Sequence, residues 1–163
     1  MSETILRDKI INWLKHESFQ VDIKEVQNTD FQLLITDAYG LGFKIDIVKL
    51  KGKDIIGIAM GLLQPEEVKT RFMTLDEKEK ARFIGGLHRE LLKMNVDHNI
   101  KHDLSHIRII EKVYTEDITR TSFMSSLQKV RDSALFTIST MTQKFSPEAP
   151  HSTSTPNNPA MYG

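Results

Sequence analysis

The chain has 163 residues, of which 39% are apolar and 27% charged, a composition typical of one soluble globular domain. Its 22 basic and 22 acidic residues balance to a formal net charge of zero, which argues against the basic surface that broad nucleic-acid binding requires. It contains no cysteine, so disulfides, thiolate catalysis and cysteine-ligated zinc are excluded.

The sequence also argues against a membrane protein. No apolar run approaches the roughly 20 residues that a membrane-spanning helix needs. The opening segment, MSETILRDKI, mixes charged with apolar residues and lacks the continuous apolar stretch of a signal peptide. The lack of cysteine fits a reducing compartment, and with no signal peptide we expect a cytoplasmic protein. From the balanced charge and the short apolar runs we expect no nucleic-acid partner and no membrane partner.

The first third of the chain predicts one helix followed by strands. Apolar residues at helical spacing over residues 4–17 predict the helix. Apolar and polar residues alternate over residues 19–24 and 43–47, which predicts strands there, and the segment FQLLITD predicts a further strand at residues 31–37. The sequences QNTD, AYGLG and KGKD supply turn residues between strands, and the glycines of AYGLG can take positive φ.

A fourth strand is expected at residues 55–63, IIGIAMGLL, which is apolar almost throughout. Such a run is typical of a central strand that is covered on both faces. Together with the three preceding strands it predicts an antiparallel meander.

The next segment changes to helical spacing. Pro65 suits the first position of a helix, and Glu66 and Glu67 suit the positive end of its dipole. Four residues beginning at Thr74 have the Thr-x-x-Glu form of a capping box, which predicts a second helix over residues 76–94.

Two glycines, Gly85 and Gly86, lie in the middle of this second helix, where each costs up to ~1 kcal/mol relative to alanine. We attribute them to the close approach of a neighbouring element. A flexible functional joint is the alternative interpretation.

The rest of the chain predicts strands at residues 96–103 and 106–114 and a long helix over residues 115–145. The long helix carries adjacent bulky pairs, Phe123 with Met124 and Leu135 with Phe136, which cannot all point inward. Part of it is therefore expected to contact another chain, or else to be enclosed by this protein's own sheet.

The composition changes after residue 145. Residues 146–163 hold four of the five prolines and very little apolar surface, so they cannot offset the entropic cost of ordering by burial. We therefore expect a single α+β domain at residues 1–145 and a disordered tail at residues 146–163.

Three histidines, His98, His102 and His106, follow one another in steps of four. On a helix they would share one face and could share a metal. The segment is β-branched, however, and on a strand His98 and His102 would lie ~13 Å apart, too far for one ion. In a hairpin, His106 could approach His102 and Asp103. A metal site and a solvated hairpin end both explain these residues.

The remaining motifs are weaker. The YGLG sequence at residues 39–42 lacks the third glycine and the following helix of a dinucleotide site. Lys49, Lys51 and Lys53 predict a solvated hairpin tip, with a phosphate or acidic-partner contact as the alternative. The glutamates near residues 66 and 77 suit helix starts. We therefore assign no catalytic residue, no metal ligand and no cofactor.

A family resemblance rests on three segments, INWLKHESFQV, YGLGFKIDIVKLKGKDIIGI, and LLQPEEVKTRF leading to RFIGGLHRELL, which fall between residues 10 and about 115. With these the chain resembles an uncharacterised, largely archaeal family catalogued as a domain of unknown function. Its order of elements also resembles the α+β fold of type III secretion chaperones, which dimerise and hold segments of partner proteins. That resemblance implies an antiparallel meander sheet with N-terminal, middle and long C-terminal helices. Those chaperones are acidic, and this chain is neutral.

Two functions from different classes follow. The favoured one is a non-enzymatic protein-interaction or chaperone-like module that forms a homodimer and binds a peptide segment along a sheet or helix face. The alternative is a small-molecule- or metal-dependent enzyme that uses the region from His98 to His106. A neutral sequence without a constellation of polar residues favours the first, and a pocket lined by histidines and carboxylates would favour the second.

Overall fold

The computed structural model describes residues 1–37 and 42–145 of the chain. The predicted disordered tail lies outside these residues, as does most of the predicted turn at residues 38–42. Within them the chain forms six strands and four helices, in the order α1 (Glu3–His16), β1 (Phe19–Lys24), β2 (Thr29–Asp37), β3 (Lys44–Leu50), β4 (Ile55–Leu63), α2 (Glu66–Met73), α3 (Glu77–Lys93), β5 (Asp97–Ile100), β6 (His106–Tyr114) and α4 (Arg120–Phe145).

The strands form one antiparallel sheet in the order β1-β2-β3-β4-β6-β5. The predicted α+β class is confirmed, and so is the meander for the first four strands. The meander does not continue beyond β4, because β6 pairs with β4 along its full length and pushes the shorter β5 to the edge. Strand β5 ends at Ile100, three residues before the predicted end at 103.

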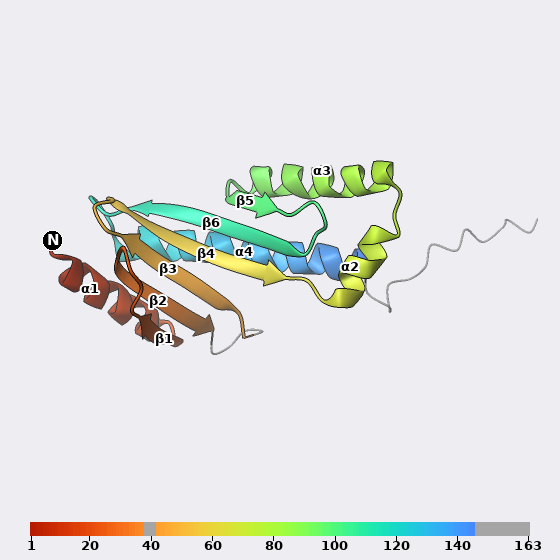
Figure 1. Cartoon of the computed structure of the whole chain (residues 1–163). Helices are drawn as coiled ribbons and strands as arrows, with labels where there is room; N and C mark the ends of the chain where they lie inside the picture. The colour runs from red at the N-terminus through yellow and green to blue at the C-terminus, as the bar shows by residue number, and fades with distance from the viewer. Residues whose placement is uncertain (38–41, 146–163) are drawn as a thin grey trace, which may run out of the picture.

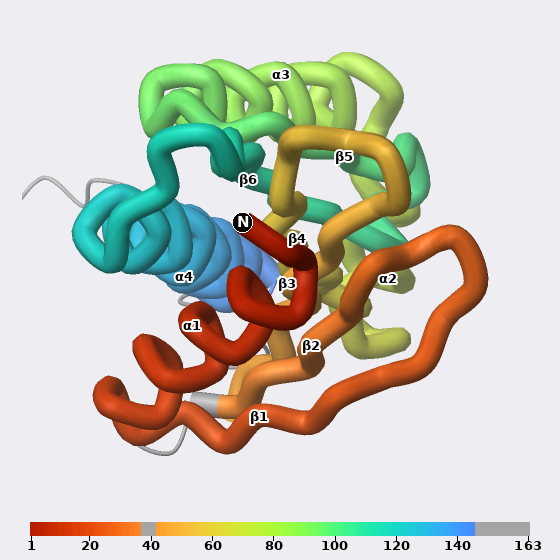
Figure 2. The backbone as a smooth tube through the Cα atoms, turned by 90° about the vertical axis from the view of Figure 1, so that its left-hand side faces the viewer, coloured from red at the N-terminus to blue at the C-terminus, as the bar shows by residue number. Residues whose placement is uncertain are grey.

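Helices α1 and α4 lie on one face of the sheet, and α2 and α3 lie at its end and its edge (Figure 1). Helix α4 runs behind β4 and β6, and α1 packs beneath β1 and β2. Helix α2 contacts α4, and α3 contacts β5 at the sheet edge. Figure 2, turned by 90°, shows α1 and α4 together on one side of the strands.

The core lies between the sheet and these helices. Leu33, Ile47 and Ile58 are fully buried and lie opposite one another on neighbouring strands. From the helices, α1 buries Ile10 and α4 buries Phe123. The ion pair between Glu17 and Arg120 and the contact between the Trp13 and Phe123 rings join α1 to α4.

Strand β4 corrects the prediction that both of its faces are covered. Its even-numbered residues Ile56, Ile58, Met60 and Leu62 are buried against the helices. Its opposite face carries Ile55, Gly57, Ala59, Gly61 and Leu63, and no described helix lies over it (Figure 1). Ala59 is nevertheless only 7% exposed, because it is small and lies between β3 and β6. Small residues occupy the three middle outward positions of the run.

The middle helices bring two more corrections. Helix α3 lies within one residue of its predicted bounds, but its capping box begins at Asp76, whose carboxylate accepts a hydrogen bond from the Glu79 amide at 2.8 Å, so the capping box predicted at Thr74 is wrong. The close approach predicted at Gly85 and Gly86 is also wrong. A Cβ at Gly85 would meet no neighbouring atom within 4 Å, and one at Gly86 would meet only Arg89, at 3.9 Å.

Candidate functional site

The three histidines predicted as a group are placed by three different elements. His98 lies in β5 with a half-buried side chain, His102 lies exposed in the turn that follows, and His106 begins β6. The imidazole of His106 packs over Gly61 of β4, where an added Cβ would lie 3.0 Å from its Nε2 atom. Each ring therefore has its own surroundings.

His98 is instead paired with His88 of α3. Nδ1 of His88 lies 2.8 Å from Nε2 of His98, and the ring centroids are 4.9 Å apart. His88 follows Ile84 by four residues and precedes Leu91 by three, so its place on the inward face of the helix was visible in the sequence. No sequence pattern links that face to β5, so the pair was not predicted.

The hydrogen bonds fix the neutral tautomers of the pair. A backbone carbonyl only accepts, so Nδ1 of His98 donates to the Val96 carbonyl at 3.1 Å. Nε2 of His98 then accepts from Nδ1 of His88. Burial, and secondly the charge interaction with His98, lower the pKa of His88 below its ordinary value of 6.5.

This pair gives no metal centre by itself. Within residues 1–37 and 42–145, no three His, Cys, Asp or Glu side chains are placed to hold one ion. Five surface cavities of about 240–410 Å³ formed by described residues have no histidine in their linings. The pocket lined by histidines and carboxylates that would favour an enzyme is therefore not among them.

The lysine cluster differs from the predicted solvated tip. Lys51 and Lys53 are exposed, but Lys49 is only 5% exposed. Its Nζ atom lies 3.0 Å from the Asp30 carboxylate and 3.4 Å from the Leu50 carbonyl. Lys49 thus forms an internal ion pair that ties β3 to the start of β2.

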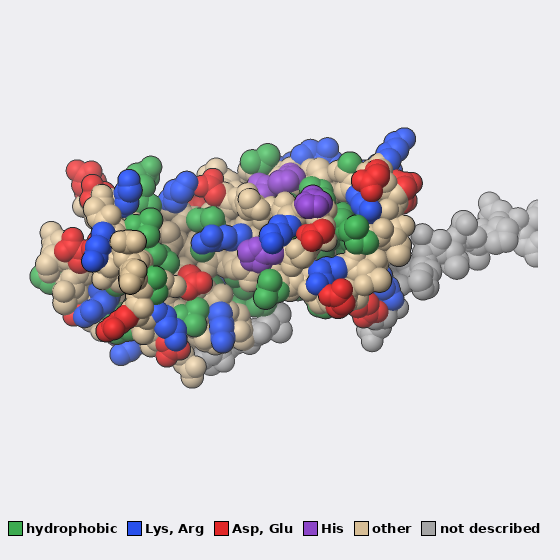
Figure 3. All heavy atoms as spheres, viewed as in Figure 1, with side chains coloured by type: hydrophobic (Ala, Val, Ile, Leu, Met, Phe, Trp, Pro, Cys, Tyr) green, Lys and Arg blue, Asp and Glu red, His purple; other side chains and the backbone are tan. Residues whose placement is uncertain are grey.

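The largest feature without a covering layer is the outer face of the sheet, which we call the open face. It consists of the outward-pointing residues of β2, β3, β4 and β6, namely Gln32, Leu34, Asp46, Val48, Gly57, Ala59, Gly61, Arg108, Ile110 and Lys112. Figure 3 views this side and shows apolar and charged side chains interspersed, with the histidines gathered toward β5 and β6.

Charge is divided unevenly across the open face. Asp46 of β3, Ala59 of β4 and Ile110 of β6 lie in one row across the sheet. Arg108 and Lys112 lie two residues on either side of Ile110, so next to this row β3 carries an acid and β6 carries two bases. Lys112 is already paired with Asp97 of β5, and Lys44 adds a base to β3 two residues before Asp46, so Arg108 is the base available to Asp46. Gln32 donates a hydrogen bond to Asp46 at 3.0 Å and holds its carboxylate in place.

At the β5 edge of the sheet, Lys112 donates a 2.7 Å hydrogen bond to Asp97. This hydrogen bond, reinforced by the opposite charges, lowers the pKa of Asp97 and raises the pKa of Lys112. In the β5–β6 turn, the hydroxyl and amide of Ser105 donate to Asp103 and lower the pKa of its carboxyl. Asp103 therefore stabilises a turn.

These features define a two-layer α+β protein whose helices leave one sheet face open. The chain belongs to the family described as "Uncharacterized conserved protein (DUF2299)", whose model matches residues 6–141. A crystal structure of an uncharacterized protein from Methanothermobacter thermautotrophicus has a similar fold, with a TM-score of 0.79 and 20% identity over 85% of this chain and 98% of that one. No curated protein matches the chain. The family confirms the predicted resemblance, whereas the comparisons identify no secretion chaperone.

Among the described residues, no helix is both long enough and apolar enough to cross a membrane.

Proposed function

We propose that the chain is a non-enzymatic, chaperone-like protein-interaction module, and that its first partner is a second copy of itself bound through the open face. The observation that carries this proposal is the uncovered middle of the sheet, where Leu34, Val48 and Ile110 are only partly buried. Antiparallel sheets often have one solvated face, but such a face is normally polar throughout. Apolar residues along its middle strands are typical of a contact surface.

The charges select one way of pairing the two sheets. If the two-fold axis runs parallel to the strands above Ala59, β3 of one copy lies over β6 of the other. Asp46 then faces the row of Ile110, between Arg108 and Lys112. If the axis runs across the strands, Asp46 faces its own copy, and like charges repel. The first arrangement is therefore favoured.

The open face is large enough for such a contact. Four strands ~4.8 Å apart and up to nine residues long, at ~3.3 Å per residue, span roughly 20 Å by 30 Å. Because side chains project from the sheet, its accessible surface area is larger than this flat area. The result is comparable with the ≈800 Å² per partner of a standard protein interface.

Other surfaces fit self-association less well. The bulky residues of α4 that predicted a second chain are largely taken up by the core, since Phe123 is buried and Met124 and Phe136 pack against it. Leu135 remains exposed. Strand β1 forms a free edge, but Asp22 and Lys24 place charges along it, and edge charges oppose strand pairing.

The test is the molar mass measured by light scattering over a dilution series. We expect the wild type to reach twice the 18.7 kDa chain mass. Arg108→Glu and Asp46→Arg should each give monomers with native circular dichroism, and the double variant Asp46→Arg/Arg108→Glu should restore the dimer. Lys78→Glu, an exposed substitution on α3, is the matched control.

A wild type that stays monomeric at its highest soluble concentration contradicts the proposed dimer. If the charge substitutions leave the dimer intact, the contact between the two copies lies on another surface. The enzyme alternative, by contrast, requires turnover that depends on His98 or His106. His98 is engaged by His88, and His106 packs over Gly61. The cytoplasmic location and the lack of membrane and nucleic-acid partners remain expectations from the sequence.

A further inference from the structure

Strands β3 and β4 separate at one end of the sheet. Their pairing ends where Asp46 lies opposite Ala59, although β4 continues to Leu63 and β3 begins two residues earlier, at Lys44. The final residues of β4 are paired with β6 alone. Figure 1 shows the two strands diverging at this point, so within residues 1–37 and 42–145 no strand pairs with the last residues of β4 on this side, and we call this stretch its free edge.

The free edge presents backbone hydrogen-bonding groups. Successive residues of an antiparallel strand direct their N–H and C=O groups to opposite edges. The Gln64 amide donates to the Ser105 carbonyl, on the side of β6, at 3.2 Å. Two residues of β4, Gly61 and Leu63, alternate with Gln64 and therefore direct their backbone groups toward the gap. An extended segment laid in the gap would meet donors and acceptors at the spacing of a strand.

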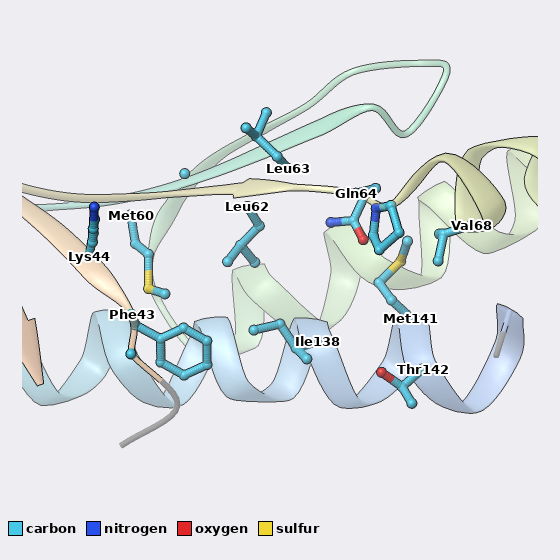
Figure 4. Close-up of a pocket in the computed structure, with 13 residues that line it drawn as sticks. Phe43, Lys44, Met60, Leu62, Leu63, Gln64, Val68, Ile138, Met141 and Thr142 are labelled. Atoms are coloured by element: carbon cyan, nitrogen blue, oxygen red, sulfur yellow. The ribbon is translucent and has the colours of Figure 1, made fainter. Parts of the chain in front are cut away.

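A cavity of about 390 Å³ opens beneath this edge. Figure 4 shows its apolar walls, with Met60 and Leu62 pointing from β4 toward α4, Ile138 and Met141 rising from α4, and Phe43 closing one end. In a strand, alternate side chains point to opposite faces. Every second side chain of an added segment would therefore enter the cavity, and these positions require apolar residues.

The charge at the cleft favours an acidic segment over a basic one. Lys44 is the one charged residue among the described residues that line the cavity, and it is exposed. Gln64 and Thr142 add uncharged polar groups. A segment with an acidic side chain on its outer face would complement Lys44, whereas a basic one would be repelled.

We infer that this cleft binds an extended, acidic segment of a partner protein, which adds as a strand to the free edge of β4 and places apolar side chains against α4. This is β-strand addition, in which the backbone supplies affinity and the pocket supplies specificity. The inference rests on the proposed role as an interaction module. The cleft uses the edge of β4 and the cavity beneath it, whereas the dimer uses the open face, and Gly61 belongs to both. The two proposals are therefore tested with separate variants.

The probe is a fluorescein-labelled seven-residue peptide in which Val and Leu alternate with Thr and Glu, and binding is followed by fluorescence anisotropy. We expect saturable binding, weakened at least fivefold when Lys replaces Glu or when alternate peptide amides are N-methylated. With Lys44→Glu the preference between the Glu and Lys peptides should reverse. A peptide of the same composition with its apolar residues consecutive should bind more weakly.

The variant that tests strand addition most directly is Leu63→Pro. Proline removes the amide that faces the gap and leaves the β4–β6 ladder its donors. The Leu63 side chain is 81% exposed, so Leu63→Ala gives the conservative comparison that keeps the amide. The Ala variant should bind the Glu peptide at least fivefold more tightly than the Pro variant, with native circular dichroism in both.

Equal affinity of the two variants overturns strand addition, and so does the absence of binding at millimolar peptide. Met161 is one of the few apolar side chains of residues 146–163, so it tests whether the chain's own C-terminal segment competes for the cleft. If Met161→Asp in the full chain strengthens peptide binding about tenfold, that segment occupies the cleft, and the partner assignment is wrong. Repeating the titration with Arg108→Glu separates the two ideas, because peptide binding by a monomer supports the cleft whatever happens to the dimer.

Discussion

Nδ1 of His88 donates a hydrogen bond to Nε2 of His98 across 2.8 Å, and this hydrogen bond joins α3 to the edge strand β5. Strand β5 has only four residues and pairs with β6 on one side. Contacts with α3 therefore matter for how firmly the edge of the sheet is held. Asp97, at the start of the same strand, adds an exposed ion pair with Lys112.

The first prediction is that stability falls on mild acidification through His88. Its pKa is below 6.5 in the folded protein, mainly because of burial, so the unfolded chain binds a proton more readily as the pH drops below 6.5. The free energy of unfolding should decrease as the pH falls from 6.5 through the lowered pKa. Thermal unfolding of wild type and His88→Gln between pH 5 and 7.5 checks this.

In His88→Gln that component of the pH dependence should vanish, whereas the exposed control His16→Gln should retain it. An unchanged pH dependence in His88→Gln would show that another group is responsible.

The second prediction is that alanine stabilises the middle of α3. Because a Cβ at Gly85 or Gly86 finds open space, each substitution gains helix propensity without a steric cost. We expect Gly85→Ala and Gly86→Ala each to raise the free energy of unfolding by about 0.5–1 kcal/mol in urea. Gly52→Ala, at φ +67°, should lower it. A loss of stability at Gly85 or Gly86 would instead indicate a constraint at that position.

The sequence predicted the helices and strands better than it predicted which of them lie side by side. Strands β4 and β6 were predicted at their observed bounds, since turn residues flank runs rich in β-branched side chains. The order of β5 and β6 was not predictable from local pattern, because both orders bury the same faces. The open side of β4 was missed because Gly57, Ala59 and Gly61 count as apolar but fill little space.

The candidate site depended on contacts that no motif encodes. The His88–His98 pair forms because the chain turns tightly between α3 and β5, with Asn95 at φ +56°. The gap beside β4 depends on where its pairing with β3 ends, at Asp46 and Ala59, and no residue pattern marks that point. Lys49 was misplaced because its neighbours Lys51 and Lys53 are solvated, whereas strand alternation turns Lys49 inward.

The third prediction concerns the internal ion pair of Lys49 and Asp30. The Asp30 carboxylate is mostly buried, and Lys49→Met removes its partner. We expect this substitution to lower the free energy of unfolding by about 3 kcal/mol. The double variant Lys49→Met/Asp30→Asn removes both charges and should recover a large part of the loss. Lys51→Met, on the exposed side of the same turn, should change stability by no more than about 0.5 kcal/mol.

Chemical denaturation of the wild type, the two single variants and the double variant measures these differences in unfolding free energy. A double variant no more stable than Lys49→Met would mean that the packing of the lysine stem, and not the unpaired carboxylate, explains the loss.

The last prediction is that Ser133→Ala stabilises the protein. Ser133 is fully buried on the sheet-facing side of α4, and its hydroxyl has no hydrogen-bond partner among the described residues. Leaving a buried hydroxyl unsatisfied costs about 1–3 kcal/mol, and alanine is the stronger helix former. We expect a gain of about 1 kcal/mol in denaturant unfolding. Thr137→Val is the comparison, because the Thr137 hydroxyl donates to the Ser133 carbonyl at 2.8 Å and its removal should cost stability. If Ser133→Ala is destabilising, its hydroxyl has a partner in solution, and an internal water beneath α4 would be the first group to look for.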